Sequence, residues 1–593
     1  MFALRNILLI GSLILISFSV IGQHSLNIVR EELMIPMRDG VRLGAIVYRP
    51  AIPGKYPVIV YRTPYGADDY DRSAAFQLRA AKAGFVVFIT DVRGRYRSEG
   101  EFEAYRNEKE DGYDLIEWCA AQPYSNGKVV TYGGSYPGIV QWQAMSQTPP
   151  HLAAAAPEMT PIGSHHFFYY GGAFSHPWLD WFMPYIFADK RRRAGDTSGT
   201  WNDNDATNEW NASDRKSWYA YRPLSEIPIL KQYAPEYYQW LNHPDSSAWW
   251  NFVSMEQDFK RFTNPVFLES GWYDAAYGPV GATRAFNKMR TESATVAAQN
   301  QTILMLGPWN HTSLNVRKTR FGEIDFGVNA GIDYDGILLD WYNYILGNEK
   351  VKEPLPKVSI FVMGENKWRA ENEWPLSRAR LMSYYLHQES NSPDHKTGTL
   401  TIHPPEKEAP DVYEFNPLDP VWDKSYEKSY PYDHRVIESR SDVLVYTTDV
   451  LSEDMEVTGE VQVELYVSSS APDTDFTFTL SDVFPDGSSI NLHGLDAGYL
   501  RMRYRNGLGK QELMKPGAVY KIRIGNVYTS NLFKKGHSIR LSVSSSIAPH
   551  YDPNPNTGTV IANEKNLVPA TNRVWHDQNH ASRLILPIIP RKN

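Results

Sequence analysis

The hexapeptide Gly133-Gly134-Ser135-Tyr136-Pro137-Gly138 stands between an apolar stretch, residues 129–132, and a stretch with helical character that begins at Tyr136. A serine at such a junction can occupy a sharp strand-to-helix turn that lifts its hydroxyl above the carboxyl edge of a sheet. Small neighbours let the backbone pass closely there. The common form places the second glycine two residues after the serine, whereas here Gly138 lies three residues after it, and Pro137 is tolerated in the first helical turn. Taken alone, the hexapeptide fits a nucleophile turn and a Gly-rich helix cap equally well.

Strands and helices alternate on both sides of this turn. The turn Arg38-Asp39-Gly40 before an alternating stretch predicts a hairpin. The pattern predicts strands at 41–47, 58–61, 85–90, 129–132, 152–157, 266–270 and 303–306, and helices at 73–83, 112–121, from 136 onward and at 336–346. Short apolar strands separated by helices indicate a mostly parallel sheet that is covered on both faces.

Two further residues complete a candidate catalytic set with Ser135. A serine nucleophile needs a base, and the base needs an acid that orients it. In this class of fold they follow in the order serine, acid, histidine, each on a loop just past a strand. Asp274 follows the predicted strand 266–270, and His311 follows the strand 303–306. Three matching contexts together favour a catalytic triad.

The chain divides into five segments. A signal peptide is predicted at 1–22, the α/β core at 23–160 and 261–375, an aromatic-rich helical cap at 161–260, and a C-terminal β-sandwich or jelly roll at 376–593. The last assignment depends on alternating strands split by Gly, Pro and Asn turns, for example at 461–467, 476–480 and 539–543. In the cap, polar residues 195–206 are expected to form a loop.

The N-terminus has the layout of a secretory signal. Arg5 precedes an apolar run over 7–21, and Val20 and Gly22 are small enough for cleavage near Gly22–Gln23. The run has 15 residues, fewer than the roughly 20 that span a bilayer, which disfavours a retained anchor. We therefore expect export to a periplasm or the outside, with no membrane attachment after cleavage. Loss of Arg5 changes the formal charge from −8 to −9.

Composition excludes several classes of protein. With 42% hydrophobic and 22% charged residues, the 593-residue chain is neither disordered nor fibrous. A net charge of −8 argues against a nucleic-acid partner. A single cysteine, Cys119, excludes disulfides and Cys-based metal sites within the chain. We expect it to lie in a helix as a small residue of the protein core. His165 and His166 lack an HExxH pattern or a carboxylate partner, so we expect them in the cap or pocket, with no metal.

Nearly the whole mature chain resembles the X-Pro dipeptidyl-peptidase, cocaine esterase and α-amino-acid ester hydrolase family of α/β-hydrolases. The elbow with glycine three residues after the serine is similar to the elbow of that family. Further matching segments are Met37-Arg38-Asp39-Gly40-Val41-Arg42-Leu43, Arg62-Thr63-Pro64-Tyr65-Gly66, Asp91-Val92-Arg93-Gly94, Ser98-Glu99-Gly100-Glu101-Phe102, Gly271-Trp272-Tyr273-Asp274, Gly307-Pro308-Trp309-Asn310-His311, Asp473-Thr474-Asp475-Phe476, Asp482-Val483-Phe484-Pro485-Asp486-Gly487 and Gly536-His537.

This resemblance implies an α/β-hydrolase fold with a helical cap, followed by a galactose-binding-like jelly roll. It implies Ser135 as nucleophile, His311 as general base and then acid, and Asp274 as the residue that orients His311. The Tyr65 hydroxyl and the Tyr136 backbone N–H would form the oxyanion hole. The second of these donors lies at a helix N-terminus, where the dipole favours negative charge. No metal or organic cofactor is implied.

One departure from the family pattern bears on the substrate. The α-amino-acid ester hydrolases carry acidic residues just after the catalytic Asp to hold an ammonium group, but here Ala275-Ala276-Tyr277 follows Asp274. An ammonium buried without a partner is costly, so an amino-acyl substrate is disfavoured. Glu269, a strand neighbour of the acid segment, is a candidate that could reach the pocket. The aromatic cap suits a flat, apolar or aromatic acyl group, and equally suits a cap that is simply well packed.

The sequence therefore predicts an exported serine hydrolase that cleaves an ester or amide in a small molecule, a peptide or an acylated glycan. Two alternatives stay open. One is an X-Pro dipeptidyl-peptidase, which would release Xaa-Pro dipeptides. The other, from a different class, is a glycan-binding surface protein whose hydrolase site is vestigial.

Overall fold

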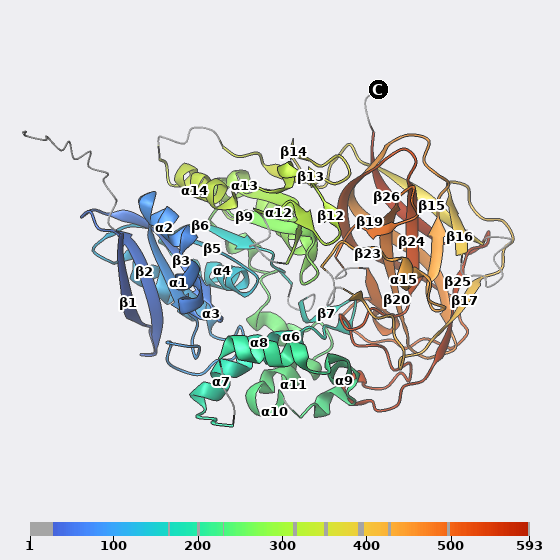
Figure 1. Cartoon of the computed structure of the whole chain (residues 1–593), viewed down its shortest axis with the longest axis horizontal. Coiled ribbons are helices and arrows are strands. Elements are labelled where there is room, and N and C mark those ends of the chain that lie inside the picture. The colour runs from blue at the N-terminus through green and yellow to red at the C-terminus, as the bar shows by residue number, and fades with distance from the viewer. Residues whose placement is uncertain are drawn as a thin grey trace, which may run out of the picture.

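The computed structural model describes residues 28–163, 167–198, 202–228, 230–311, 317–348, 354–388, 397–424, 429–494 and 498–590. The predicted signal peptide, with His165 and His166, lies outside these ranges. Two large sheets stand side by side, and the helices of the cap lie beneath the first of them in the view of Figure 1. Within the described ranges no helix is both long and apolar enough to cross a membrane.

The first sheet has ten strands in the order β1-β2-β4-β3-β5-β6-β9-β10-β13-β14. Strands β4 to β13 of this order run parallel, and antiparallel pairs close both edges. Every residue of β4 and β9 is buried, because helices cover both faces of the sheet. The strands are β1 (Ile28–Pro36), β2 (Arg42–Pro50), β3 (Tyr56–Thr63), β4 (Val86–Asp91), β5 (Ser125–Gly134), β6 (Leu152–Glu158), β9 (Phe267–Tyr273), β10 (Ile303–Asn310), β13 (Val358–Val362) and β14 (Lys367–Glu371).

Helices flank this sheet as the alternating pattern predicts. They are α1 (Ala67–Ser73), α2 (Ala75–Lys82), α3 (Glu108–Ala120), α4 (Tyr136–Ser146), α12 (Gly278–Glu292), α13 (Val296–Gln301) and α14 (Tyr334–Ile345). The helix expected over 73–83 is found as α2, whereas α1, which the pattern did not predict, ends just before it and is separated from it by the non-helical Ala74. Helix α3 starts four residues before the predicted 112, with three acidic residues in a first turn where the helix dipole favours negative charge. Cys119 is buried in α3, as predicted.

The cap follows β6. Its elements are β7 (Tyr169–Tyr170), β8 (Ala173–Phe174), α6 (Trp178–Trp181), the π-helical turn η1 (Phe182–Ile186), α7 (Phe187–Arg193), α8 (Asp203–Ala212), α9 (Arg215–Ala220), η2 (Leu224–Glu226), α10 (Leu230–Tyr233), α11 (Pro235–Leu241), η3 (Ala248–Phe252) and η4 (Phe259–Arg261). The loop expected over 195–206 is shorter than predicted, because Asn202 caps α8 by accepting the Asp205 N–H. The Phe168 ring lies 4.9, 4.6 and 4.5 Å from those of Trp178, Trp240 and Trp250, so these tryptophans form an aromatic core.

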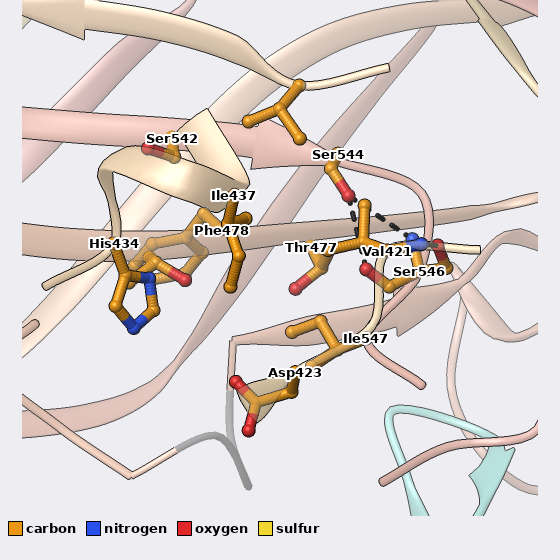
Figure 2. Close-up of a pocket in the computed structure, with 12 residues that line it drawn as sticks. Val421, Asp423, His434, Ile437, Thr477, Phe478, Ser542, Ser544, Ser546 and Ile547 are labelled. Carbon is orange, nitrogen blue, oxygen red and sulfur yellow. Dashed lines mark hydrogen bonds between the residues drawn. The ribbon is translucent and has the colours of Figure 1, made fainter. Parts of the chain in front are cut away.

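The second sheet forms the C-terminal β domain. Its described pairs are antiparallel except for β16 with β18. A cavity of about 30 Å³ lies inside this domain, where Thr477, Phe478, Ser542 and Ser544 line it (Figure 2). The strands are β15 (Arg380–Gln388), β16 (Thr397–Thr401), β17 (Asp411–Phe415), β18 (Leu444–Thr447), β19 (Met455–Ser469), β20 (Asp475–Val483), β21 (Ser489–Asn491), β22 (Tyr499–Arg501), β23 (Tyr520–Phe533), β24 (Ser538–Ser544), β25 (Ala570–Trp575) and β26 (Arg583–Ile589).

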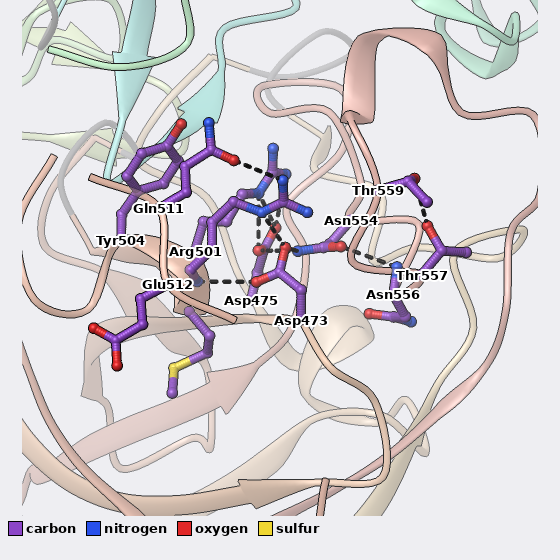
Figure 3. A network of polar contacts seen from close by, with 12 residues as sticks. Asp473, Asp475, Arg501, Tyr504, Gln511, Glu512, Asn554, Asn556, Thr557 and Thr559 are labelled. Carbon is purple, nitrogen blue, oxygen red and sulfur yellow. Dashed lines mark hydrogen bonds and ion pairs between the residues drawn. The ribbon is translucent and has the colours of Figure 1, made fainter. Parts of the chain in front are cut away.

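A buried ion-pair network joins the β domain to the cap. The Arg501 guanidinium pairs with Asp475 at 2.9 Å and with Asp552 at 3.1 Å, and all three side chains are almost wholly buried. Asp552 also accepts the backbone N–H of Phe174 in β8. The backbone N–H of Arg501 donates to the Gly171 carbonyl. Figure 3 shows the same network extending through Asp473 and Asn554. Since a buried charge without its partner is costly, this network fixes the β7–β8 hairpin against the β domain.

Candidate active site

Ser135 occupies the turn between β5 and α4 in a strained conformation. Its φ of 63° and ψ of −127° are rarely adopted by residues other than glycine. A Cβ at Gly133 would lie 2.7 Å from the Cβ of Pro137, and a Cβ at Gly138 would lie 2.3 Å from the Thr160 methyl. The glycine three residues after the serine is therefore required by the close approach of α4 to Thr160.

The structure brings the three predicted triad side chains together. His311 Nε2 lies 3.0 Å from Ser135 Oγ, and His311 Nδ1 lies 2.8 Å from Asp274 Oδ1. The carboxylate accepts the Nδ1 proton, which leaves Nε2 free to accept the serine proton. Asp274 is fully buried, whereas the His311 side chain is about one-third exposed. The three residues are neighbours because they follow the ends of the parallel strands β5, β9 and β10.

The glycines of the acid and base segments permit this meeting. A Cβ at Gly271 would lie 2.1 Å from the Trp309 carbonyl oxygen, and a Cβ at Gly307 would lie 2.4 Å from the Trp309 ring. The register between β9 and β10 shifts between Gly307 and Asn310, which re-aims the chain just before His311. The glycines before Asp274 and His311 therefore leave room for Trp309, whose backbone lies against β9 and whose ring lies over Gly307.

The two predicted oxyanion donors lie beside the serine. The Tyr65 oxygen accepts the Trp181 indole N–H at 3.1 Å, which leaves the Tyr65 hydroxyl proton available to another acceptor. Burial raises the pKa of Tyr65, and hydrogen bonds with Trp181 and Ser135 lower it by a smaller amount. The phenol is therefore protonated at neutral pH. The Tyr136 N–H is the first of α4 and has no acceptor within the helix.

The Tyr136 side chain fixes the start of α4. Its hydroxyl donates to Glu108 at 2.7 Å and accepts the Tyr105 N–H at 3.1 Å. Its ring is fully buried and stacks with those of Tyr105 at 4.3 Å and Trp181 at 6.0 Å. The first turn of the helix, and hence the direction of its leading N–H, is held by these contacts.

Two aromatic residues at the site were not predicted from the sequence. Trp181 is the hydrogen-bond donor to Tyr65, and the Tyr277 ring lies edge-on to His311 at 4.9 Å. Burial raises the pKa of Tyr277, while a hydrogen bond to the Ser135 hydroxyl opposes this shift. The Phe167 ring lies 5.0 Å from that of Tyr277. Only the position of Tyr277, three residues after Asp274, offered a signal in the sequence.

Glu269 does not reach the pocket. It is fully buried, and in the sheet it stands in register with Glu158 of β6. Neither of its carboxyl oxygens has a hydrogen-bond partner in the described part of the chain. Burial raises its pKa well above the ordinary value, and the nearby Glu158 and Asp274 raise it further. This residue therefore belongs to the interior behind the serine turn and is no ligand for a substrate ammonium group.

The groups that surround Ser135 determine which chemistry the site can perform. Among the described residues, no group of three or more His, Cys, Asp and Glu side chains is arranged to hold a metal ion. The described constellation therefore consists of a hydroxyl, an imidazole, a carboxylate and two hydrogen-bond donors. Such a set can perform nucleophilic acyl transfer by itself.

Comparisons with known proteins cover both domains of the chain. Residues 39–313 match the model of the X-Pro dipeptidyl-peptidase (S15) family, and residues 349–585 match the X-Pro dipeptidyl-peptidase C-terminal non-catalytic domain. The chain is 34% identical over 586 residues to a cocaine esterase from Rhodococcus sp. (strain MB1 Bresler), covering 95% of this chain and 99% of that protein.

Two solved structures share the fold over nearly the whole chain. An aminopeptidase from the marine sediment archaeon Thaumarchaeota archaeon is 25% identical with a TM-score of 0.78, covering 95% of this chain and 97% of that one. An α-amino acid ester hydrolase is 23% identical with a TM-score of 0.79, covering 98% of this chain and 100% of that one. The two-domain architecture described above is thus shared with enzymes of known structure.

Proposed function

From the premise that this chain belongs to the X-Pro dipeptidyl-peptidase (S15) family of serine hydrolases, we propose that it cleaves carboxylic esters through an acyl-enzyme on Ser135. The observation that carries the proposal is the pair of contacts made by His311. One imidazole nitrogen lies 3.0 Å from the serine hydroxyl, and the other lies 2.8 Å from a buried carboxylate.

The first half-reaction forms the acyl-enzyme. Ser135 Oγ attacks the ester carbonyl carbon while His311 Nε2 takes its proton. The carbonyl oxygen becomes an oxyanion that accepts hydrogen bonds from the Tyr65 hydroxyl and the Tyr136 N–H. Asp274 remains ionised and stabilises the imidazolium. The C–O bond to the leaving group then breaks, and His311 gives its proton to the departing alkoxide.

The second half-reaction releases the acid. His311 Nε2 removes a proton from water, whose oxygen attacks the acyl carbon. The same two donors stabilise the second oxyanion. When this intermediate collapses, Ser135 Oγ leaves and regains its proton from His311. The products are one carboxylic acid and one alcohol, and the enzyme returns to its starting state without any cofactor.

The surroundings of Ser135 favour an apolar or aromatic acyl group. The rings of Tyr277 and Trp181 stand beside the catalytic residues, and Phe167 packs against Tyr277. In the segment after Asp274, two alanines stand where an α-amino-acid ester hydrolase would carry an ammonium-binding carboxylate, and Glu269 is fully buried beside Glu158. An ester of an apolar acid therefore fits better than an amino-acyl ester or the free N-terminus of a peptide.

The family match keeps X-Pro dipeptidyl-peptidase activity as the second candidate function. The glycan-binding alternative has less support, because Ser135, His311 and Asp274 form an intact hydrogen-bonded set, which a vestigial site has no need to keep. We also propose export, on the basis of the N-terminal 22 residues. Intact-mass measurement of the secreted protein tests this, since retention of Met1 would contradict cleavage.

Hydrolysis assays separate these candidates. We expect wild type to hydrolyse p-nitrophenyl butyrate and benzoate and to be labelled by a fluorophosphonate at Ser135. Ser135→Ala should lose both, whereas the exposed Ser247→Ala serves as a control that loses neither. Faster release from Gly-Pro-p-nitroanilide than from the esters would favour the peptidase. Wild-type turnover in Ser135→Ala would refute the mechanism.

A further inference from the structure

The segment that carries Asp274 is held from outside its own sheet. We name residues 272–277 the acid loop. The Gly494 N–H of the β domain donates to the Trp272 carbonyl at 3.0 Å. In the opposite direction, the Tyr273 hydroxyl donates to the Asn491 carbonyl at 3.1 Å. These two hydrogen bonds tie the start of the acid loop to the last residue of β21 and to the segment that follows it.

The two domains also meet closely at Gly494. A Cβ at this position would lie 2.6 Å from the Asp274 carbonyl oxygen, 2.8 Å from its carbonyl carbon and 3.1 Å from the Ala275 Cα. All three are backbone atoms, which cannot rotate away as a flexible side chain can. The β domain therefore touches the backbone of the catalytic acid itself, at a separation that only glycine allows.

The segment 491–494 is itself well fixed. The Asn491 side-chain amide donates to the His493 carbonyl at 2.9 Å, and its side-chain oxygen accepts the Tyr432 N–H at 3.1 Å. The Leu492 carbonyl accepts the Thr529 hydroxyl at 2.8 Å. Because these partners belong to different parts of the β domain, they hold the backbone of residues 491–494 in place against the acid loop.

The position of the carboxylate depends on the loop backbone. Asp274 Oδ1, the oxygen that faces His311, also accepts the N–H groups of Ala276 at 2.9 Å and Tyr277 at 3.3 Å. The Ala276 carbonyl in turn accepts the Tyr170 hydroxyl of the cap at 2.8 Å. A shift of the loop by a few tenths of an ångström would therefore move the carboxylate relative to the imidazole.

We propose that the β domain is part of the catalytic apparatus, in that the segment 491–494 positions the carboxylate of Asp274 against His311, with Gly494 as a positioning residue. This inference rests on the proposed function, since it needs Asp274 to orient the base. Misplacement of a catalytic group by about 1 Å can cost roughly 100-fold in rate.

A matched pair of glycine substitutions tests the proposal in the full-length enzyme. Gly494→Ala forces a Cβ against the backbone of Asp274. Gly498→Ala forces one equally closely, at 2.5 Å, against the Phe478 carbonyl oxygen inside the β domain. We expect Gly494→Ala to lower kcat for p-nitrophenyl butyrate and the rate of fluorophosphonate labelling by 10- to 100-fold, with KM within twofold. Gly498→Ala should keep kcat within about threefold.

A second variant covers the case in which Gly494→Ala fails to fold. Tyr273→Phe keeps the ring and removes the hydrogen bond to Asn491, and we expect a 3- to 10-fold loss in kcat with unchanged KM. Equal losses in Gly494→Ala and Gly498→Ala, or an unchanged kcat in Gly494→Ala or in Tyr273→Phe, would overturn the inference. Failure of the proposed function looks different, because wild type itself would then be neither active on esters nor labelled at Ser135.

Discussion

The buried carboxyl pair behind the serine turn should make stability fall as pH rises. Glu158 and Glu269 are fully or almost fully buried, and Glu158 receives the Ser135 N–H on its backbone carbonyl. Burial raises the pKa of Glu158 from 4.5 to about 8, with a smaller opposing influence from Tyr334 and a supporting one from Asp335. The folded chain therefore keeps a proton at neutral pH that the unfolded chain has lost.

The size of the effect follows from proton linkage. The folded-state pKa is raised, so the contribution of Glu158 is fully present below pH 4.5 and is lost as pH rises to about 8. Each pH unit in that window costs about 1.4 kcal/mol of unfolding free energy, which gives about 5 kcal/mol across it. Glu158→Gln cannot ionise, so this loss should disappear in the variant.

The assay is urea unfolding at pH 5, 6, 7 and 8, followed by tryptophan fluorescence, for wild type, Glu158→Gln and the exposed control Glu101→Gln. Between pH 5 and 8, we expect the free energy of unfolding of Glu158→Gln to rise by several kcal/mol relative to that of wild type. Glu101→Gln should follow wild type at each pH. Parallel pH profiles for wild type and Glu158→Gln would refute the reasoning, because they would mean that Glu158 is ionised in the folded protein.

Two further predictions concern the oxyanion site and the serine turn. Tyr65→Phe removes one oxyanion donor, so kcat should fall roughly 100- to 1000-fold with little change in KM. Steady-state kinetics on p-nitrophenyl esters measure both constants. A loss in kcat below threefold would exclude Tyr65 from the oxyanion hole. Gly138→Ala places a Cβ 2.3 Å from the Thr160 methyl, so thermal unfolding should show a lower Tm. Adding Thr160→Ser, which removes that methyl, should restore part of the lost Tm. An unchanged Tm in Gly138→Ala would show that α4 can move away from Thr160 at no cost.

Much of the core was predictable because its determinants are local. Apolar strands separated by helices, with a serine between glycines at one junction, indicate a covered parallel sheet and its nucleophile turn. Asp274 and His311 could be paired with Ser135 because the carboxyl ends of parallel strands lie at the same edge. The glycines at 271 and 307 are part of the same short motifs. The reason for them, the close approach of Trp309 to both, is visible only in three dimensions.

Other features were decided by contacts between residues far apart in the chain. Glu269 was a candidate for the pocket in the sequence, and only the register of β9 against β6 places it beside Glu158 in the interior. The hydrogen bond from Trp181 to Tyr65 joins residues 116 positions apart, and the bond from Tyr273 to Asn491 joins residues 218 apart. Periodicity and short motifs predict the local backbone structure around a residue. Which surfaces meet depends on how whole elements pack, and that packing alone set the β domain against the backbone of Asp274.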